Sequence, residues 1–108
     1  VLLSALTDLD VIRHVDFVAE DLKLTEDSIA RLSPALMPQS HPAPFITGVG
    51  ALESDEFKRQ NALIIERWQP NHRKDVPLDG YNHLTICDMF ALRGHPLFEQ
   101  SCKLIEKN

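Results

Sequence analysis

The sequence predicts an α/β fold in which three parallel strands are joined by helical crossovers, within one domain spanning residues 1–108. Apolar runs at 1–6 and 45–49 have the length and composition of buried strands, and residues 74–78, KDVPL, are the third strand candidate. Segments with helical periodicity separate these runs, and such alternation is typical of parallel sheets. Three strands cannot cover both faces and both edges of a sheet. We therefore expect part of a larger sheet, with an apolar edge near residues 1–6 unless another segment covers it.

Composition narrows the class of protein. The hydrophobic content of 44% and the charged content of 25% are ordinary for a soluble globular domain. The net charge of −5 argues against a nucleic-acid surface, which needs clustered Lys and Arg. No apolar run approaches the roughly 20 residues that span a bilayer. Cys87 and Cys102 make no disulfide framework and indicate a reduced, cytoplasmic protein. Because residue 1 is Val, we expect a processed chain or part of a longer one.

The first third of the chain predicts one strand and two helices. The strand at 1–6 ends in turn-forming residues, and a helix is expected to begin at Asp10, whose carboxylate would cap it. Thr25 suits the N-cap of a second helix, because the acidic Glu26 and Asp27 follow it. Pro34 should end that helix near residue 32.

The middle of the chain predicts the most buried strand and the clearest helix. The strand is expected at 45–49, where Gly48 and Gly50 indicate that another group approaches the backbone closely. Ser54 is the expected cap of the following helix. Apolar residues then recur at helical spacing from Phe57 to Trp68 and predict a core-facing stripe.

The last third predicts an edge strand and a final helix. Pro77 lacks an N–H group, so the strand at 74–78 should lie at a sheet edge or be irregular. A short helical turn is expected over residues 84–90. His95 is the expected cap before Pro96, the first residue of the last helix. The buried stripe of that helix is predicted from three residues, Phe98, Cys102 and Ile105.

An acid and a histidine follow two neighbouring strands. Glu53 comes after the second strand, and His83 comes after the third. Catalytic groups of open α/β sheets gather at the carboxyl ends of the strands, so we expect these two side chains to meet. A carboxylate that orients a histidine is the acid–base part of a hydrolytic triad. The nucleophile is missing, because no serine lies in a Gly-x-Ser-x-Gly elbow: the serines are Ser4, Ser28, Ser33, Ser40, Ser54 and Ser101.

The same loops resemble a known family. Residues 50–60, GALESDEFKRQ, resemble the acid loop and following helix of the arylformamidase (kynurenine formamidase) branch of the α/β-hydrolase fold. In that branch a strand ending in glycine leads to an acid and then to Ser-x-Glu-Phe-x-Arg-Gln. Residues 80–86, GYNHLTI, are similar to its histidine loop. Leu32-Ser33-Pro34 and Thr7-Asp8-Leu9 resemble two further turns, so the resemblance spans nearly the whole chain.

The resemblance implies that the chain is the C-terminal part of an α/β-hydrolase. Such an enzyme would cleave small esters or aryl formamides by a Ser–His–acid mechanism, without a cofactor. Glu53 takes the acid position, and Asp55 is its rival, since the family more often has Asp there. His83 takes the position of the general base. The serine and the oxyanion donors are then expected upstream, in the N-terminal half of the domain or in a covering partner chain.

Other readings of the sequence stay open. The chain could be a truncated, non-catalytic hydrolase fragment that acts as a structural or interaction module. A Cys87–His83 nucleophile pair is conceivable, although apolar neighbours would keep the thiol unreactive. No metal site is expected, because neither cysteine has a partner at ligand spacing. The sequence leaves a homodimer open, and it predicts neither nucleic acid nor a membrane as a partner.

Overall fold

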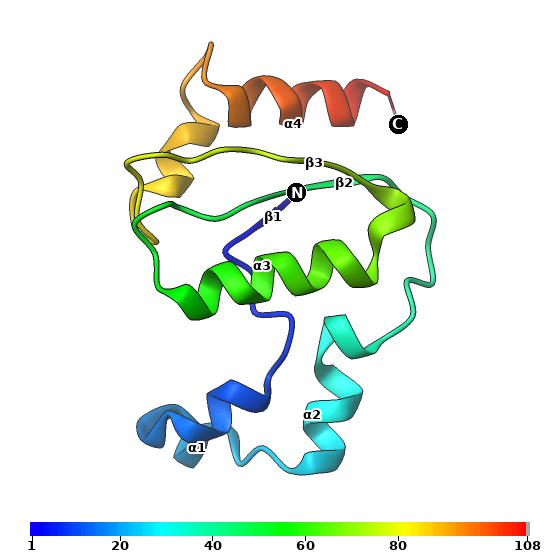
Figure 1. The fold of residues 1–108 in the computed structure, drawn as a ribbon, viewed down its shortest axis with the longest axis vertical. Helices are drawn as coiled ribbons and strands as arrows, with labels where there is room; N and C mark the ends of the chain where they lie inside the picture. Colours follow the sequence, from blue (N-terminus) through cyan, green and yellow to red (C-terminus); the bar gives the residue numbers. More distant parts are fainter. Residues whose placement is uncertain (108) are drawn as a thin grey trace.

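The computed structural model describes residues 1–107 and contains a parallel sheet in the order β1-β2-β3 (Figure 1). The strands are β1 (Leu2–Leu3), β2 (Phe45–Gly48) and β3 (His72–Asp75). Both pairs of neighbours run parallel, and a bridge between Gly50 and Leu78 continues the contact beyond β2 and β3. The predicted α/β arrangement of three parallel strands is therefore confirmed.

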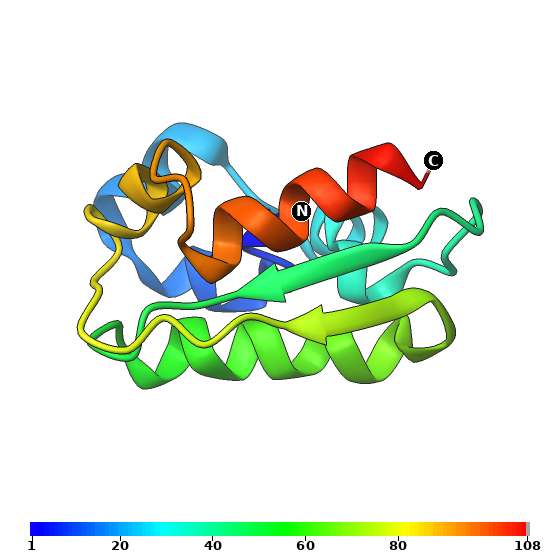
Figure 2. The ribbon, with the colours of Figure 1, turned by 90° about the horizontal axis from the view of Figure 1, so that it is seen from above.

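Helices cover both faces of this sheet. Figure 2 shows α3 on one face and α4 on the other, whereas α1 and α2 form a lobe at one end of the long axis in Figure 1. The molecule measures 42 × 31 × 19 Å along its principal axes. The α-helices are α1 (Asp16–Leu22), α2 (Glu26–Leu32), α3 (Asp55–Arg67) and α4 (Pro96–Glu106). Shorter 3-10 turns are η1 (Asp10–His14), η2 (Pro34–Leu36), η3 (Gln69–Asn71) and η4 (Ile86–Phe90).

The outer strands differ from the predicted ranges for backbone reasons. β1 stops at Leu3 because Ser4 has a φ of 43°, which is incompatible with an extended strand. β3 begins at His72, two residues earlier than predicted, and ends at Asp75. Pro77 has no N–H for the ladder, so pairing resumes only at Leu78. The prediction of an edge or irregular strand around Pro77 is confirmed among the described residues.

Three of the four predicted helix caps are confirmed. The Thr25 side chain accepts from the N–H of Ser28, Ser54 accepts from that of Phe57, and His95 accepts from that of Leu97. The prediction for Asp10 is wrong: it lies inside η1, and its own N–H donates to the Asp8 carboxylate. The expected single helix is split into η1 and α1, in a segment whose β-branched residues disfavour continuous helix.

The core lies between the sheet and α4. Its buried members are Ile46, Val76, Leu78, Ile86 and Leu97, and Leu3, Tyr81, Met89 and Leu104 pack against them. The predicted stripe of α4 is wrong, because the helix is turned so that another row faces the sheet. Leu97 and Ser101 are buried, whereas Ile105 is 73% exposed. Burying Ser101 costs little, since its hydroxyl donates to the carbonyl of Leu97.

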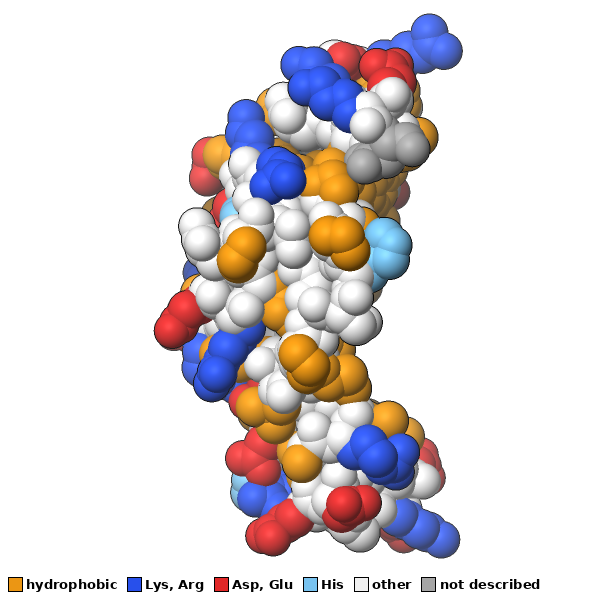
Figure 3. All heavy atoms as spheres, turned by 90° about the vertical axis from the view of Figure 1, so that its right-hand side faces the viewer, with side chains coloured by type: hydrophobic (Ala, Val, Ile, Leu, Met, Phe, Trp, Pro, Cys, Tyr) orange, Lys and Arg blue, Asp and Glu red, His pale blue; other side chains and the backbone are white. Residues whose placement is uncertain are grey.

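Apolar side chains remain exposed near β1. Val1 is 44% exposed and Leu6 is 43% exposed, as expected for an uncovered sheet edge. Apolar patches interrupt the polar surface along the face in Figure 3. Cys87 is exposed rather than embedded among apolar neighbours, and Cys102 is half-buried. Among residues 1–107, none of the helices combines the length and hydropathy that spanning a bilayer requires.

Candidate active site

Glu53 and His83 are in direct contact. Glu53 follows β2, His83 follows β3, and their side chains meet at the carboxyl ends of these strands. The distance between Nδ1 of His83 and Oε1 of Glu53 is 2.7 Å. The contact between the two side chains was predicted from their places at neighbouring strand ends together with the resemblance of the two loops, and it is present.

Backbone hydrogen bonds join the two loops that carry this pair. The N–H of Ala51 donates to the carbonyl of Leu78 at 3.0 Å, and the N–H of Leu52 donates to that of Tyr81 at 3.1 Å. A Cβ atom at Gly50 would lie 2.3 Å from the Tyr81 carbonyl oxygen. The predicted close approach at Gly50 is therefore confirmed, and it is the histidine loop that approaches.

The Glu53 carboxylate is buried and fully hydrogen-bonded. Its side chain is 1% exposed. Oε2 accepts from the Ser4 hydroxyl at 2.5 Å and from the Gly50 N–H at 2.6 Å, which leaves Oε1 for His83. Burial alone would raise the pKa of Glu53, but hydrogen bonds from Ser4, Gly50 and His83 outweigh it and lower this pKa below 4.5. The group is therefore an ionised carboxylate at neutral pH.

Ser4 is a member of the site that was not identified from the sequence. It lies directly after β1, is 6% exposed, and reaches Glu53 across a separation of 49 residues. Its φ of 43° is unusual for a residue other than glycine. A signal did exist in the sequence: a lone hydroxyl inside an apolar run needs a buried partner.

The imidazole of His83 is held on two sides. The Asn82 side-chain oxygen accepts from the N–H groups of Leu84 and Thr85, which fixes the turn that presents His83. The ring of Phe57 stacks on the imidazole with a centroid distance of 4.6 Å and an interplanar angle of 28°. The His83 side chain is nonetheless 54% exposed, and within residues 1–107 its Nε2 has no hydrogen-bond partner.

A buried glutamine fixes α3 against the turn after β1. Gln60 is fully buried, and its Oε1 accepts from the N–H groups of Thr7 and Asp8. Its Nε2 donates to the Asp8 carbonyl and to Glu56. The buried hydroxyl of Ser33 accepts from the N–H of the residue that follows Asp8. Segments singled out in the sequence thus form one polar network that supports the acid loop.

Asp55 points away from the site. It is the first residue of α3, its side chain is fully exposed, and its nearest charged partner is Lys58 at 4.0 Å. Among the hydrogen bonds and ion pairs of residues 1–107, none joins Asp55 to His83. The geometry therefore favours Glu53 over Asp55 as the acid.

The described residues contain no nucleophile beside the imidazole. Four serines, Ser28, Ser33, Ser54 and Ser101, are engaged in caps or backbone contacts elsewhere. Ser4 is hydrogen-bonded to the acid rather than to the base. No hydrogen bond joins the exposed thiol of Cys87 to His83 within residues 1–107. The same part of the chain groups no three His, Cys, Asp or Glu side chains that could hold a metal ion.

In this site, Nδ1 of His83 is hydrogen-bonded to the buried, ionised carboxylate of Glu53, and Nε2 is directed away from that carboxylate. This arrangement can take up a proton at Nε2 and stabilise the resulting imidazolium. Comparison of the chain with models of known protein families, with curated proteins and with solved structures gave no significant match.

Proposed function

We propose that the chain supplies the acid and the general base of a serine hydrolase that cleaves small esters or aryl formamides. The observation that carries this proposal is the 2.7 Å contact between the buried Glu53 carboxylate and Nδ1 of a half-exposed His83. Buried carboxylates cost free energy unless they are paired, and this one is paired with an imidazole that reaches solvent. The family resemblance of the two loops gives the same assignment.

Each residue has a defined step in the proposed reaction. Nε2 of His83 removes the proton of a serine hydroxyl as the serine oxygen attacks the substrate carbonyl. Glu53 holds the imidazole through Nδ1 and stabilises the imidazolium. The proton then passes to the departing alcohol or arylamine, and water hydrolyses the acyl-enzyme through the same base. Ser4 and the Gly50 N–H keep the carboxylate in place.

The nucleophile in this proposal comes from another part of the polypeptide or from a covering chain. The uncovered edge of β1, flanked by the exposed Val1 and Leu6, is where further strands of the sheet would pair. That edge runs beside the strand end that carries Ser4. An added strand would therefore bring its carboxyl end toward the Glu53–His83 pair.

The decisive experiment removes the base in the complete protein that contains this chain. His83→Ala should lower kcat for 4-nitrophenyl acetate and for formanilide by about 10⁴-fold or more, because the serine loses its proton acceptor. His14→Ala is the matched control, since His14 is exposed in η1 and lies outside the site. Near-normal turnover of the His83→Ala protein would refute the assignment.

A second candidate function is a non-catalytic module that pairs with another chain through β1. Two observations favour it: every serine except Ser40 is engaged away from the base, and apolar side chains are exposed at the edge. A fluorophosphonate probe distinguishes the two functions, because it labels the nucleophile of a serine hydrolase. A native polypeptide close to 12.2 kDa without a labelled serine would favour the module.

A further inference from the structure

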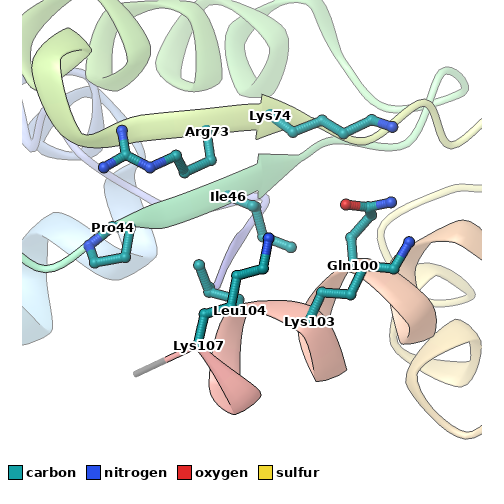
Figure 4. Close-up of a pocket in the computed structure, with 8 residues that line it drawn as sticks. All are labelled: Pro44, Ile46, Arg73, Lys74, Gln100, Lys103, Leu104 and Lys107. Atoms are coloured by element: carbon teal, nitrogen blue, oxygen red, sulfur yellow. The ribbon is translucent and has the colours of Figure 1, made fainter.

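A cationic hollow lies near the amino end of β2, whereas the Glu53–His83 pair follows the carboxyl ends of β2 and β3. It occupies about 320 Å³ between β2, β3 and the second half of α4 (Figure 4). Pro44, Ile46 and Leu104 form its apolar lining. Because Pro44 and Ile46 stand at the amino end of β2, the hollow is separate from the proposed catalytic site.

Four of the chain's eleven Lys and Arg residues line this hollow, and no Asp or Glu does. Arg73 and Lys74 come from β3, whereas Lys103 and Lys107 come from α4 (Figure 4). None of the four takes part in an ion pair within residues 1–107. In a protein of net charge −5, four cations without ion-pair partners concentrate positive charge beside one hollow.

A β-bulge places two successive cations beside the hollow. His72 pairs with Phe45 and Lys74 pairs with Ile46, so the register shifts and Arg73 has no partner in the ladder. In a regular strand, neighbouring side chains point to opposite faces. A bulge changes that alternation and re-aims side chains. Here Arg73 and Lys74 both line the same hollow.

The orientation of α4 brings the other polar groups to the same place. The helix buries Leu97 and Ser101 instead of the more apolar row that ends at Ile105. This rotation leaves Gln100, Lys103 and Lys107 beside the sheet, where Figure 4 shows them around the opening. Lysines on an edge strand often serve only to keep the edge solvated. That role does not explain why β3 and α4 both place cations around the same apolar surface.

We propose that this hollow binds an organic phosphate monoester with a small aryl or alkyl group. Nη1 of Arg73 donates to the carbonyl of Pro70 at 3.2 Å, so its Nε and Nη2 are the groups that would bind two phosphate oxygens. The ammonium groups of the lysines add compact positive charge. Gln100 supplies an amide donor at the rim, and the apolar floor accommodates the organic group. The volume is at the lower end of the range for small-ligand pockets, which suits a ligand with one ring or a short chain.

The test is a titration of the complete protein with phenyl phosphate, followed by NMR of the backbone amides or by calorimetry. We expect saturable binding with the largest shifts around Ile46, Lys74 and Lys103. The Lys74→Glu/Lys103→Glu double variant should raise Kd by about tenfold or more, since two attractive charges become repulsive. Lys58→Glu/Arg67→Glu is the matched control, because it makes the same charge change on α3, across the sheet, and should leave Kd within about twofold.

Two further probes separate the parts of the proposal. Inorganic phosphate should bind more weakly than phenyl phosphate, because it leaves the apolar floor uncovered, and benzyl alcohol should show no saturable binding. Equal affinity for inorganic and phenyl phosphate would refute the organic ester as the ligand. Shifts spread over other surfaces, or an unchanged Kd in the Lys74→Glu/Lys103→Glu protein, would refute the site. None of these readouts depends on hydrolysis, so this proposal and the proposed function fail independently.

Discussion

Charged side chains at the two ends of the sheet have opposite environments. At the carboxyl ends, the Glu53 carboxylate is almost fully buried, and both of its oxygens are hydrogen-bonded by groups of the same chain. Around the cationic hollow, Arg73, Lys74, Lys103 and Lys107 are exposed and have no acidic partner within residues 1–107.

This difference indicates two kinds of site. A buried charge is tolerated only with complete local compensation, and groups of the same chain hold the Glu53 side chain in place. Exposed charges of the same sign cost little free energy while water hydrates them. They therefore remain available to a ligand of opposite charge.

The largest effect is expected when the carboxylate at position 53 loses its charge. Glu53→Gln keeps the shape of the side chain but removes the charge that stabilises the imidazolium, and kcat in the complete protein should fall by about 10³-fold to 10⁴-fold. Asp55→Asn should leave kcat unchanged, because that side chain is fully exposed and paired only weakly with Lys58. A greater loss at Asp55 than at Glu53 would transfer the acid role to Asp55.

The Glu53–His83 contact could be predicted because local signals placed both residues at strand ends and the two loops resembled those of a known family. Glycines ended the strand before Glu53, and a proline marked the outer strand before His83. Parallel strands bring such loops together regardless of packing detail. The caps at Thr25 and Ser54 could be predicted for the same reason, since a cap depends on residues within one helical turn.

Features set by tertiary packing could not be read in this way. Ser4 contacts Glu53 only because β1 pairs with β2, and no local pattern specifies that partner. The predicted buried face of α4 lies one row of side chains away from the observed face. Ser101 can be buried because its hydroxyl donates a hydrogen bond to the carbonyl of Leu97. The bulge at Arg73 depends on register, which is set by the pairing of two distant strands.

A smaller effect, on stability, is expected at Ser4. Hydrogen bonds to a buried charged group contribute about 1.5–3 kcal/mol, so Ser4→Ala should lower the free energy of unfolding by about 2 kcal/mol. Ser4→Gly loses the same bond but relieves a left-handed backbone, so it should be less destabilising than Ser4→Ala by about 1 kcal/mol. Urea unfolding measures all three proteins.

Ser101→Ala is the control for this comparison. Ser101 is also buried, but its hydroxyl donates to a neutral carbonyl, so its loss should cost about 1 kcal/mol or less. If Ser4→Ala and Ser101→Ala proved equally mild, Ser4 would contribute no more than an ordinary buried hydroxyl.

A further effect on stability is confined to acidic pH. The pKa of Glu53 is lower in the folded protein than in the unfolded chain, so the unfolded state binds more protons as the pH falls through this range. The stabilisation from Glu53 is present above the ordinary carboxyl pKa near 4.5 and is lost as the pH falls through the folded value. The difference in Tm between wild type and Glu53→Gln should therefore narrow from pH 7 to pH 3. A difference that stays constant over this range would contradict the lowered pKa.

The smallest effect, on the free energy of unfolding, should differ between the two ends of the sheet. Arg59 binds Glu56 and Asp8 beside the acid loop, so Arg59→Gln should destabilise the protein by about 0.5–1 kcal/mol. Lys74→Gln removes one of four neighbouring cations, so it should leave stability unchanged or raise it by a few tenths of a kcal/mol. Unfolding in urea at low salt measures both, and added salt should diminish both effects. If Lys74 does not stabilise the free protein but is required for phosphate binding, its role is in ligand binding. Equal destabilisation by both substitutions would instead show that Lys74 stabilises the fold.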